Sequence, residues 1–155
     1  MPSAETAFWL MKTEPDEFSI DDLQKKGVAR WDGVRNYQAR NYLRTMRQGD
    51  SVIIYHSSCA EPAAVGLATV VRAAYPDPTQ FDPTSEYHDP KSPPADPRWS
   101  AVDVRHVRTF TAPVTLASMR LRTDLEGLIL LRPGTRLSVT PVSATHAALL
   151  IRFGK

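Results

Sequence analysis

Two apolar runs rich in β-branched residues lie close together near the middle of the chain, and they constrain its fold most strongly. The first covers residues 51–58 and the second residues 64–75, and they are separated by a short segment that includes Cys59, Ala60, Glu61 and Pro62. Branched and aromatic side chains favour strands because they pack well on a pleated surface. Two such runs joined by a short connection are typical of a β-hairpin. The sequence therefore predicts a fold with a β-hairpin at its centre.

Further strands and helices are predicted on both sides of this hairpin. Bulky or alternating apolar residues predict strands at three places: residues 8–11, 99–110 and 136–142. Three residues are suited to cap the N-terminus of a helix: Ser19, Asn36 and Ser143. Residues 114–131 are expected to be helical or mixed. Because strands and helices do not alternate regularly, we predict the α+β class, with a small mixed or barrel-like sheet whose concave mouth is a usual ligand site.

A proline-rich stretch follows the predicted hairpin. Seven of the 13 prolines fall between Pro76 and Pro97, which predicts a long loop without regular structure over about residues 76–98. Phe81 and Tyr87 lie inside this stretch, so its composition differs from that of a domain linker. We therefore expect one domain over residues 1–155, with a loop that is functional or mobile.

Composition narrows the class of protein. No apolar run approaches the roughly 20 residues that a membrane span needs, and a single cysteine leaves no internal disulfide. We therefore expect a cytoplasmic protein, or a nuclear one in a eukaryote, without membrane contact. The net charge of +2 conceals 8 basic and 3 acidic residues, a net +5, over residues 101–155. This skew permits nucleic-acid contact, although an ordinary solvated surface explains it more simply.

The sequence lacks the familiar motifs of enzymes and metal sites. It has no glycine-rich phosphate loop and no nucleophile elbow, and one cysteine with four scattered histidines is not a recognisable metal-ligand pattern. We therefore expect no cofactor and no metal. His56 and Cys59 resemble a base with a thiol nucleophile, but a small buried cysteine is the commoner explanation.

Polar and aromatic residues gather at the predicted strand ends and turns. Trp31 lies beside an Asp-Gly turn and offers a flat surface, on which stacking contributes about 1–3 kcal/mol per nucleic-acid base. The alternative is that Trp31 covers the edge of the core. His56 and Ser57 can read the polar edge of a heterocycle or satisfy neighbouring backbone groups. Asn36 can contact a ligand and cap a helix at once.

Arginines add a second group of candidates. Helical spacing brings Arg40, Arg44 and Arg47 to one face, where a phosphate backbone would relieve their mutual repulsion and a solvated face is the alternative. Arg136 and Ser138 alternate with apolar neighbours, so they share the polar face of a predicted strand.

Five segments of the sequence resemble the EVE domain, a relative of the YTH and ASCH domains in the PUA-like group, and the thymocyte nuclear protein family in particular. They run nearly from end to end: Trp9 to Pro15, Trp31 to Asn41, Tyr55 to Ser57, Tyr75 to Thr79 and Arg136 to Val142. The resemblance implies a PUA-like fold, with a small curved sheet surrounded by helices and a pocket for a modified nucleobase of DNA or RNA. By position it implies eight pocket residues: Lys12, Thr13, Trp31, Asn36, Tyr55, His56, Ser57 and Ser138. It also implies three contacts to the nucleic-acid backbone: Arg35, Arg40 and Arg136.

The function predicted from these observations is recognition of a methylated or otherwise substituted base that is flipped into the pocket, without bond-making. Trp31 is expected to cover the face of the base, while Asn36, His56 or Ser57 reads its edge. One buried methyl group contributes only about 0.8 kcal/mol, so strong discrimination needs a further hydrogen bond or a steric penalty. Trp31→Ala is expected to weaken binding and to leave the thermal melt nearly unchanged.

Two other functions remain open from the sequence. An enzyme acting on a base or on RNA would use His56 as acid or base, together with Glu14 or Asp32. A protein-interaction module would use the loop at residues 76–98, and its deletion would then spare oligonucleotide binding.

Overall fold

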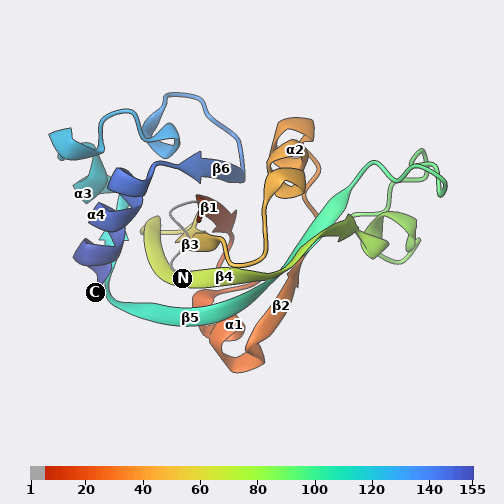
Figure 1. Cartoon of the computed structure of the whole chain (residues 1–155), viewed down its shortest axis with the longest axis horizontal. Helices are drawn as coiled ribbons and strands as arrows, with labels where there is room; N and C mark the ends of the chain where they lie inside the picture. Colours follow the sequence, from red (N-terminus) through yellow and green to blue (C-terminus); the bar gives the residue numbers. More distant parts are fainter. Residues whose placement is uncertain (1–5) are drawn as a thin grey trace.

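The computed structural model describes residues 6–155, and these form a curved six-stranded mixed sheet with helices around it (Figure 1). The strands are β1 (Phe8–Thr13), β2 (Val28–Trp31), β3 (Ser51–His56), β4 (Ala63–Pro76), β5 (Ser100–Thr115) and β6 (Val139–Val142). Their order is β2-β5-β4-β3-β1-β6, in which β1 and β3 are parallel and the other neighbours antiparallel. Within the described residues β2 and β6 are not paired with each other, so the sheet is not closed into a barrel.

In residues 6–155 four α-helices accompany the sheet, and the predicted caps begin three of them. The helices are α1 (Ile20–Lys26), α2 (Tyr37–Thr45), α3 (Leu116–Arg120) and α4 (Ala144–Gly154). The side chains of Ser19, Asn36 and Ser143 each accept a hydrogen bond from the first turn of α1, α2 and α4, at 3.1, 2.9 and 3.1 Å. These contacts satisfy backbone N–H groups that lack a partner within the helix. No helix of residues 6–155 has the length and apolar character to cross a bilayer.

Alternate residues of the central strands face two separate hydrophobic cores. Met11 and Ile54 belong to the core that α1 and α2 cover, whereas the preceding residues Leu10 and Ile53 belong to the core that α3 and α4 cover. This division follows from the two-residue period of a strand. Figure 1 shows α3 and α4 together at one end of the long β4–β5 pair, with α1 and α2 nearer its middle.

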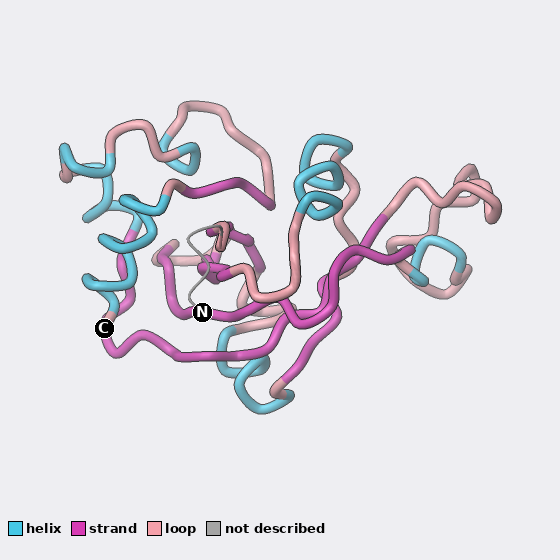
Figure 2. The backbone as a smooth tube through the Cα atoms, in the orientation of Figure 1, coloured by secondary structure: helices cyan, strands magenta, loops and turns pink. Residues whose placement is uncertain are grey.

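The proline-rich segment projects from the far end of the β4–β5 pair (Figure 2). Where the sequence predicts a loop without regular structure over about residues 76–98, residues 77–99 form turns and one short 3-10 helix (Pro78–Phe81). The segment is nevertheless internally packed, since Asp77 and Gln80 are fully buried.

The α+β class and most elements are confirmed, with three differences. β2 is not predicted by the sequence, because it is a four-residue edge strand with exposed Val28 and Arg30. β5 continues to Thr115, so that helix and short 3-10 turns occupy only residues 116–131 of the segment expected to be helical or mixed. The strand predicted at residues 136–142 begins only at Val139.

Candidate nucleobase-binding cavity

A cavity of about 570 Å³ opens at the carboxyl ends of the parallel strands β1 and β3. β6 runs antiparallel to β1 and therefore begins at the same place, where the Lys12 N–H donates to the Ser138 carbonyl at 2.8 Å. The end of β2 at Trp31 and the turn after it complete this side of the wall. The volume lies within the range of about 300–1,000 Å³ that is common for small-molecule sites.

Most of the predicted site residues meet at this cavity. Six of the eight predicted pocket residues line it: Lys12, Thr13, Trp31, Asn36, Ser57 and Ser138. Of the predicted backbone contacts, Arg35 and Arg136 line the cavity and Arg40 does not. The fold thus joins residues from four strand ends that are widely separated in the sequence. Contact of each with a ligand remains a prediction.

Tyr55 and His56 lie outside the cavity wall. Tyr55 is 3% exposed and packs in the core beneath α3 and α4, because it points to the opposite face of β3 from His56. His56 accepts a hydrogen bond at its Nε2 from the backbone N–H of Ile20, at 3.0 Å. Burial lowers the pKa of His56, which favours the neutral ring that this bond requires. The structure therefore does not bring these two residues together with the other six.

Trp31 packs in the core and also lines the cavity. It is 8% exposed, and its ring meets Phe18 edge to face with centroids 6.1 Å apart. The indole N–H groups of Trp9 and Trp99 donate to aspartate carboxylates at 3.0 and 2.7 Å. The indole N–H of Trp31 has no hydrogen-bond partner in residues 6–155. Truncating so buried a ring costs about 3–5 kcal/mol, so we now expect Trp31→Ala to lower the thermal midpoint as well as to weaken binding.

Several polar groups of the wall are free to contact a ligand. The Asn36 side-chain oxygen is used as the cap of α2, but its amide N–H₂ has no partner in the described part of the chain. The hydroxyl groups of Ser57 and Ser138 likewise make no hydrogen bond with residues 6–155. The Thr13 hydroxyl differs, because it donates to the Phe18 carbonyl at 2.7 Å.

Charges of both signs line the cavity. Lys12 and Arg136 have no ion-pair partner among the described residues, and burial lowers the pKa of Lys12. Glu14 and Glu17 also lie in the wall, while Asp32 forms an ion pair with a neighbouring arginine at 2.8 Å. Lys12 and Arg136 are therefore the cations best placed to meet an anionic group at the mouth.

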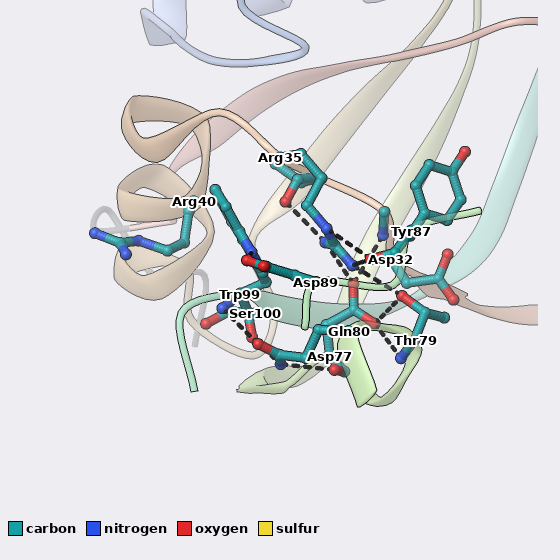
Figure 3. A network of polar contacts seen from close by, with 12 residues as sticks. Asp32, Arg35, Arg40, Asp77, Thr79, Gln80, Tyr87, Asp89, Trp99 and Ser100 are labelled. Atoms are coloured by element: carbon teal, nitrogen blue, oxygen red, sulfur yellow. Dashed lines mark hydrogen bonds and ion pairs between the residues drawn. The ribbon is translucent and has the colours of Figure 1, made fainter. Parts of the chain in front are cut away.

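The other two predicted backbone contacts make hydrogen bonds within the protein. The Arg35 guanidinium donates twice to the Tyr87 carbonyl, at 3.1 and 2.7 Å, and to Asp77 at 3.1 Å (Figure 3). Arg40 donates to the Arg98 carbonyl at 3.1 Å. Both arginines therefore hold the loop between β4 and β5 against the start of α2.

Sequence reasoning also misses six wall residues: Glu17, Phe18, Gly33, Val34, Ser58 and Tyr87. Tyr87 reaches the cavity from the loop between β4 and β5, and the only local signal is an aromatic residue within a proline-rich stretch. Among residues 6–155 no three His, Cys, Asp or Glu side chains are grouped so that they could hold a metal ion.

Comparison with known proteins places the chain in a family. The EVE domain model matches residues 7–153. Mouse thymocyte nuclear protein 1 is 47% identical over 124 residues, which are 73% of this chain and 55% of the mouse protein. The chain thus spans about half the length of the curated relatives it matches.

Solved structures agree with this match. A crystal structure of a Pseudomonas syringae protein has a TM-score of 0.93 at 52% identity, with 96% of this chain and 100% of that one covered. Human THYN1, crystallised in complex with 5-methylcytosine-containing DNA, has a TM-score of 0.91 at 37% identity, with 97% and 98% covered. The chain belongs to the EVE domain family.

Proposed function

We propose that this chain binds nucleic acid and takes a modified base, such as 5-methylcytosine, into the cavity without making or breaking a covalent bond. The observation that carries the proposal is the combination, in one wall, of the Trp31 and Phe18 rings with free hydrogen-bonding groups on Asn36, Ser57 and Ser138. The similarity to human THYN1, which was crystallised with 5-methylcytosine-containing DNA, supports the same ligand class.

The cavity suits the energetic needs of such binding. A base inside a duplex must leave the stack, which costs a few kcal/mol. Contact of the base with the rings of Trp31 and Phe18 would offset part of that cost. The methyl group of the modified base contributes only about 0.8 kcal/mol when buried. The amide N–H₂ of Asn36 offers a hydrogen bond to an acceptor on the base edge, and a misplaced base would leave it unpaired. Lys12 and Arg136 are available for the flanking phosphates.

The position of His56 supports binding rather than catalysis. A general base must lie within hydrogen-bond reach of the proton that it removes. His56 is the histidine that the sequence favours for this role, but it lies outside the wall and its Nε2 is occupied by the Ile20 N–H. Of its two predicted carboxylate partners, Asp32 is engaged with Arg30 at 2.8 Å, and Glu14 lies in the wall that His56 does not reach.

The proposal is tested by fluorescence polarisation with matched oligonucleotides that contain cytosine or 5-methylcytosine, as single strands and as duplexes. The wild-type chain should bind the methylated form more tightly. Asn36→Ser keeps a capping oxygen but removes the amide donor, so it should weaken methylated binding by up to about tenfold. Asn41→Ser, the same change at an exposed site outside the wall, is the matched control. Equal wild-type affinity for both forms would contradict the proposal.

The unpaired cations of the wall, Lys12 and Arg136, allow a second test through the salt dependence of binding. If Arg136 contacts a phosphate, Arg136→Ala should reduce the slope of log Kd against log salt concentration by about one, equally for methylated and unmethylated DNA. Arg132→Ala provides the control, because Arg132 is exposed on the same segment and lies outside this cavity. An unchanged slope in Arg136→Ala would remove Arg136 from the interface.

A further inference from the structure

The loop between β4 and β5 forms one wall of the cavity through Tyr87. The Tyr87 ring lies directly against Gly33, since a Cβ atom added to Gly33 would come within 2.7 Å of a ring carbon. Gly33 also has a positive φ of +76°, which L side chains rarely adopt. The turn after β2 and the loop are therefore in close contact at the edge of the proposed base site.

A partly buried ion pair joins the same two segments (Figure 3). Asp77 is fully buried, and its carboxylate accepts from the Gly33 N–H at 2.8 Å and from Arg35 at 3.1 Å. Burial alone would raise the pKa of Asp77, but the hydrogen bonds from Thr79, Gly33 and Arg35 outweigh it and the pKa is lowered. Arg35 then reaches across to the Tyr87 carbonyl through two donors, at 3.1 and 2.7 Å. Asp77 and Arg35 thus fix the backbone of Tyr87 relative to Gly33.

Gln80 supplies a second anchor inside the loop. It is fully buried, and its Nε2 donates to the carbonyls of Asp77 and Trp99 at 2.7 and 2.9 Å. Its Oε1 accepts from the Ser92 hydroxyl at 2.6 Å and from the Trp99 N–H at 3.1 Å. Both donors and the acceptor of the amide are therefore used, as a stable buried polar group requires. The loop is held in one shape by these contacts despite its prolines.

We propose that Tyr87 contacts the bound nucleotide and helps to select the modified base, and that Arg35 and Asp77 act as positioning residues that hold Tyr87 in the wall. The inference rests on the proposed function and deepens it. Asp77 is 0% exposed and Arg35 directs its donors to protein acceptors, so both act through Tyr87. Burial, followed by the charge of Glu86, raises the pKa of Tyr87 to about 12, so its hydroxyl keeps its proton at neutral pH.

Binding of methylated and unmethylated oligonucleotides to Tyr87 variants tests the direct contact. Tyr87→Ala should weaken binding of the methylated form by about tenfold, the effect of losing one aromatic contact to a base, and should reduce the preference for it. Tyr87→Phe should retain most of that affinity if the ring face makes the contact. Phe81→Ala is the matched control, because Phe81 is a 39% exposed aromatic residue of the same loop that lies outside the wall. If Tyr87→Ala binds like Phe81→Ala, the inference is overturned.

Arg35→Lys and Asp77→Asn test the positioning role. Lysine keeps the charge but lacks the planar fork that reaches Asp77 and the Tyr87 carbonyl together. Both variants should lose selectivity, become sensitive to proteolysis within residues 77–99, and keep the wild-type salt slope. A phosphate-contacting Arg35 would give the opposite result, with binding retained in Arg35→Lys and a reduced salt slope in Arg35→Ala.

Failure of this inference can be distinguished from failure of the proposed function. A wild-type chain without preference for the methylated form contradicts the proposed function. A wild-type preference that persists in Tyr87→Ala and Asp77→Asn overturns the role of the loop alone.

Discussion

Replacing Gly33 with alanine tests the contact between the turn after β2 and the loop wall. The added methyl group would meet three ring atoms of Tyr87 at 2.7, 2.8 and 3.0 Å. The first two distances are shorter than real Cβ contacts, so the ring or the turn must move. Movement of the ring is opposed by Arg35, which holds the Tyr87 carbonyl through two hydrogen bonds.

The expected loss of stability has two parts. A left-handed backbone conformation costs an L-residue about 1–2 kcal/mol. Relieving the overlap with a packed ring costs about a further 1–3 kcal/mol. Gly33→Ala should therefore lower the free energy of unfolding by about 2–5 kcal/mol, which for a chain of this size is roughly 4–20 °C in the thermal midpoint.

Gly134→Ala separates the two parts. Gly134 has a similar φ of +71°, but nothing lies within 4 Å of the place that an alanine Cβ would take, so only the backbone cost should be seen. Thermal melting of Gly33→Ala, Tyr87→Ala and the double variant forms a double-mutant cycle. The steric overlap between the alanine methyl group and the Tyr87 ring should appear in it as a coupling energy of about 1–3 kcal/mol. Additive effects in this cycle, or equal melting of Gly33→Ala and Gly134→Ala, would refute the described contact.

Three further predictions concern stability. Asn36→Ala should lower the free energy of unfolding by about 1 kcal/mol in urea titrations, and Asn36→Ser should recover most of it, whereas equal stability of the two would argue against the cap. Burial lowers the pKa of His56 from 6.5, so the unfolded chain takes up a proton at this residue before the folded chain does as pH falls. The free energy of unfolding should therefore decline below about pH 6.5. His56→Gln should reduce the change in the urea midpoint between about pH 7.5 and about pH 5.5. An identical pH slope in that variant would contradict the role of His56. Gly154→Ala should destabilise the chain although alanine favours helices, because its methyl group would lie 2.3 Å from the Phe110 ring; a raised melting temperature would contradict this.

The elements that sequence reasoning predicts are those whose signals are local. β1 and β3 are buried on both faces and therefore appear as continuous apolar runs, with Leu10 and Met11 packing into opposite cores. Helix starts are visible because a cap is a contact within a few residues, as at Asn36. β2 is different, because a short edge strand needs few apolar residues and its pairing with β5 is made far along the chain.

Residues of the candidate site also differ in whether a local sequence signal indicates them. Strand-end residues such as Lys12 and Ser138 are found through the resemblance and line the cavity. The adjacent residues Tyr55 and His56 look equivalent in the sequence, but the strand period sends them to opposite faces. The role of Arg35 depends on Asp77, a long-range partner that no local pattern indicates.

The central claim is that a modified base enters the cavity beside Trp31, and the chain contains its own controls for testing it. A ¹⁵N NMR titration with a 5-methylcytosine oligonucleotide follows the side-chain N–H signals of Asn36 and of the three tryptophans. The signals of Trp31 and Asn36 should shift on binding, whereas those of Trp9 and Trp99, which are bonded to aspartates at 3.0 and 2.7 Å, should stay in place. Binding of the oligonucleotide with unchanged Trp31 and Asn36 signals would contradict the claim.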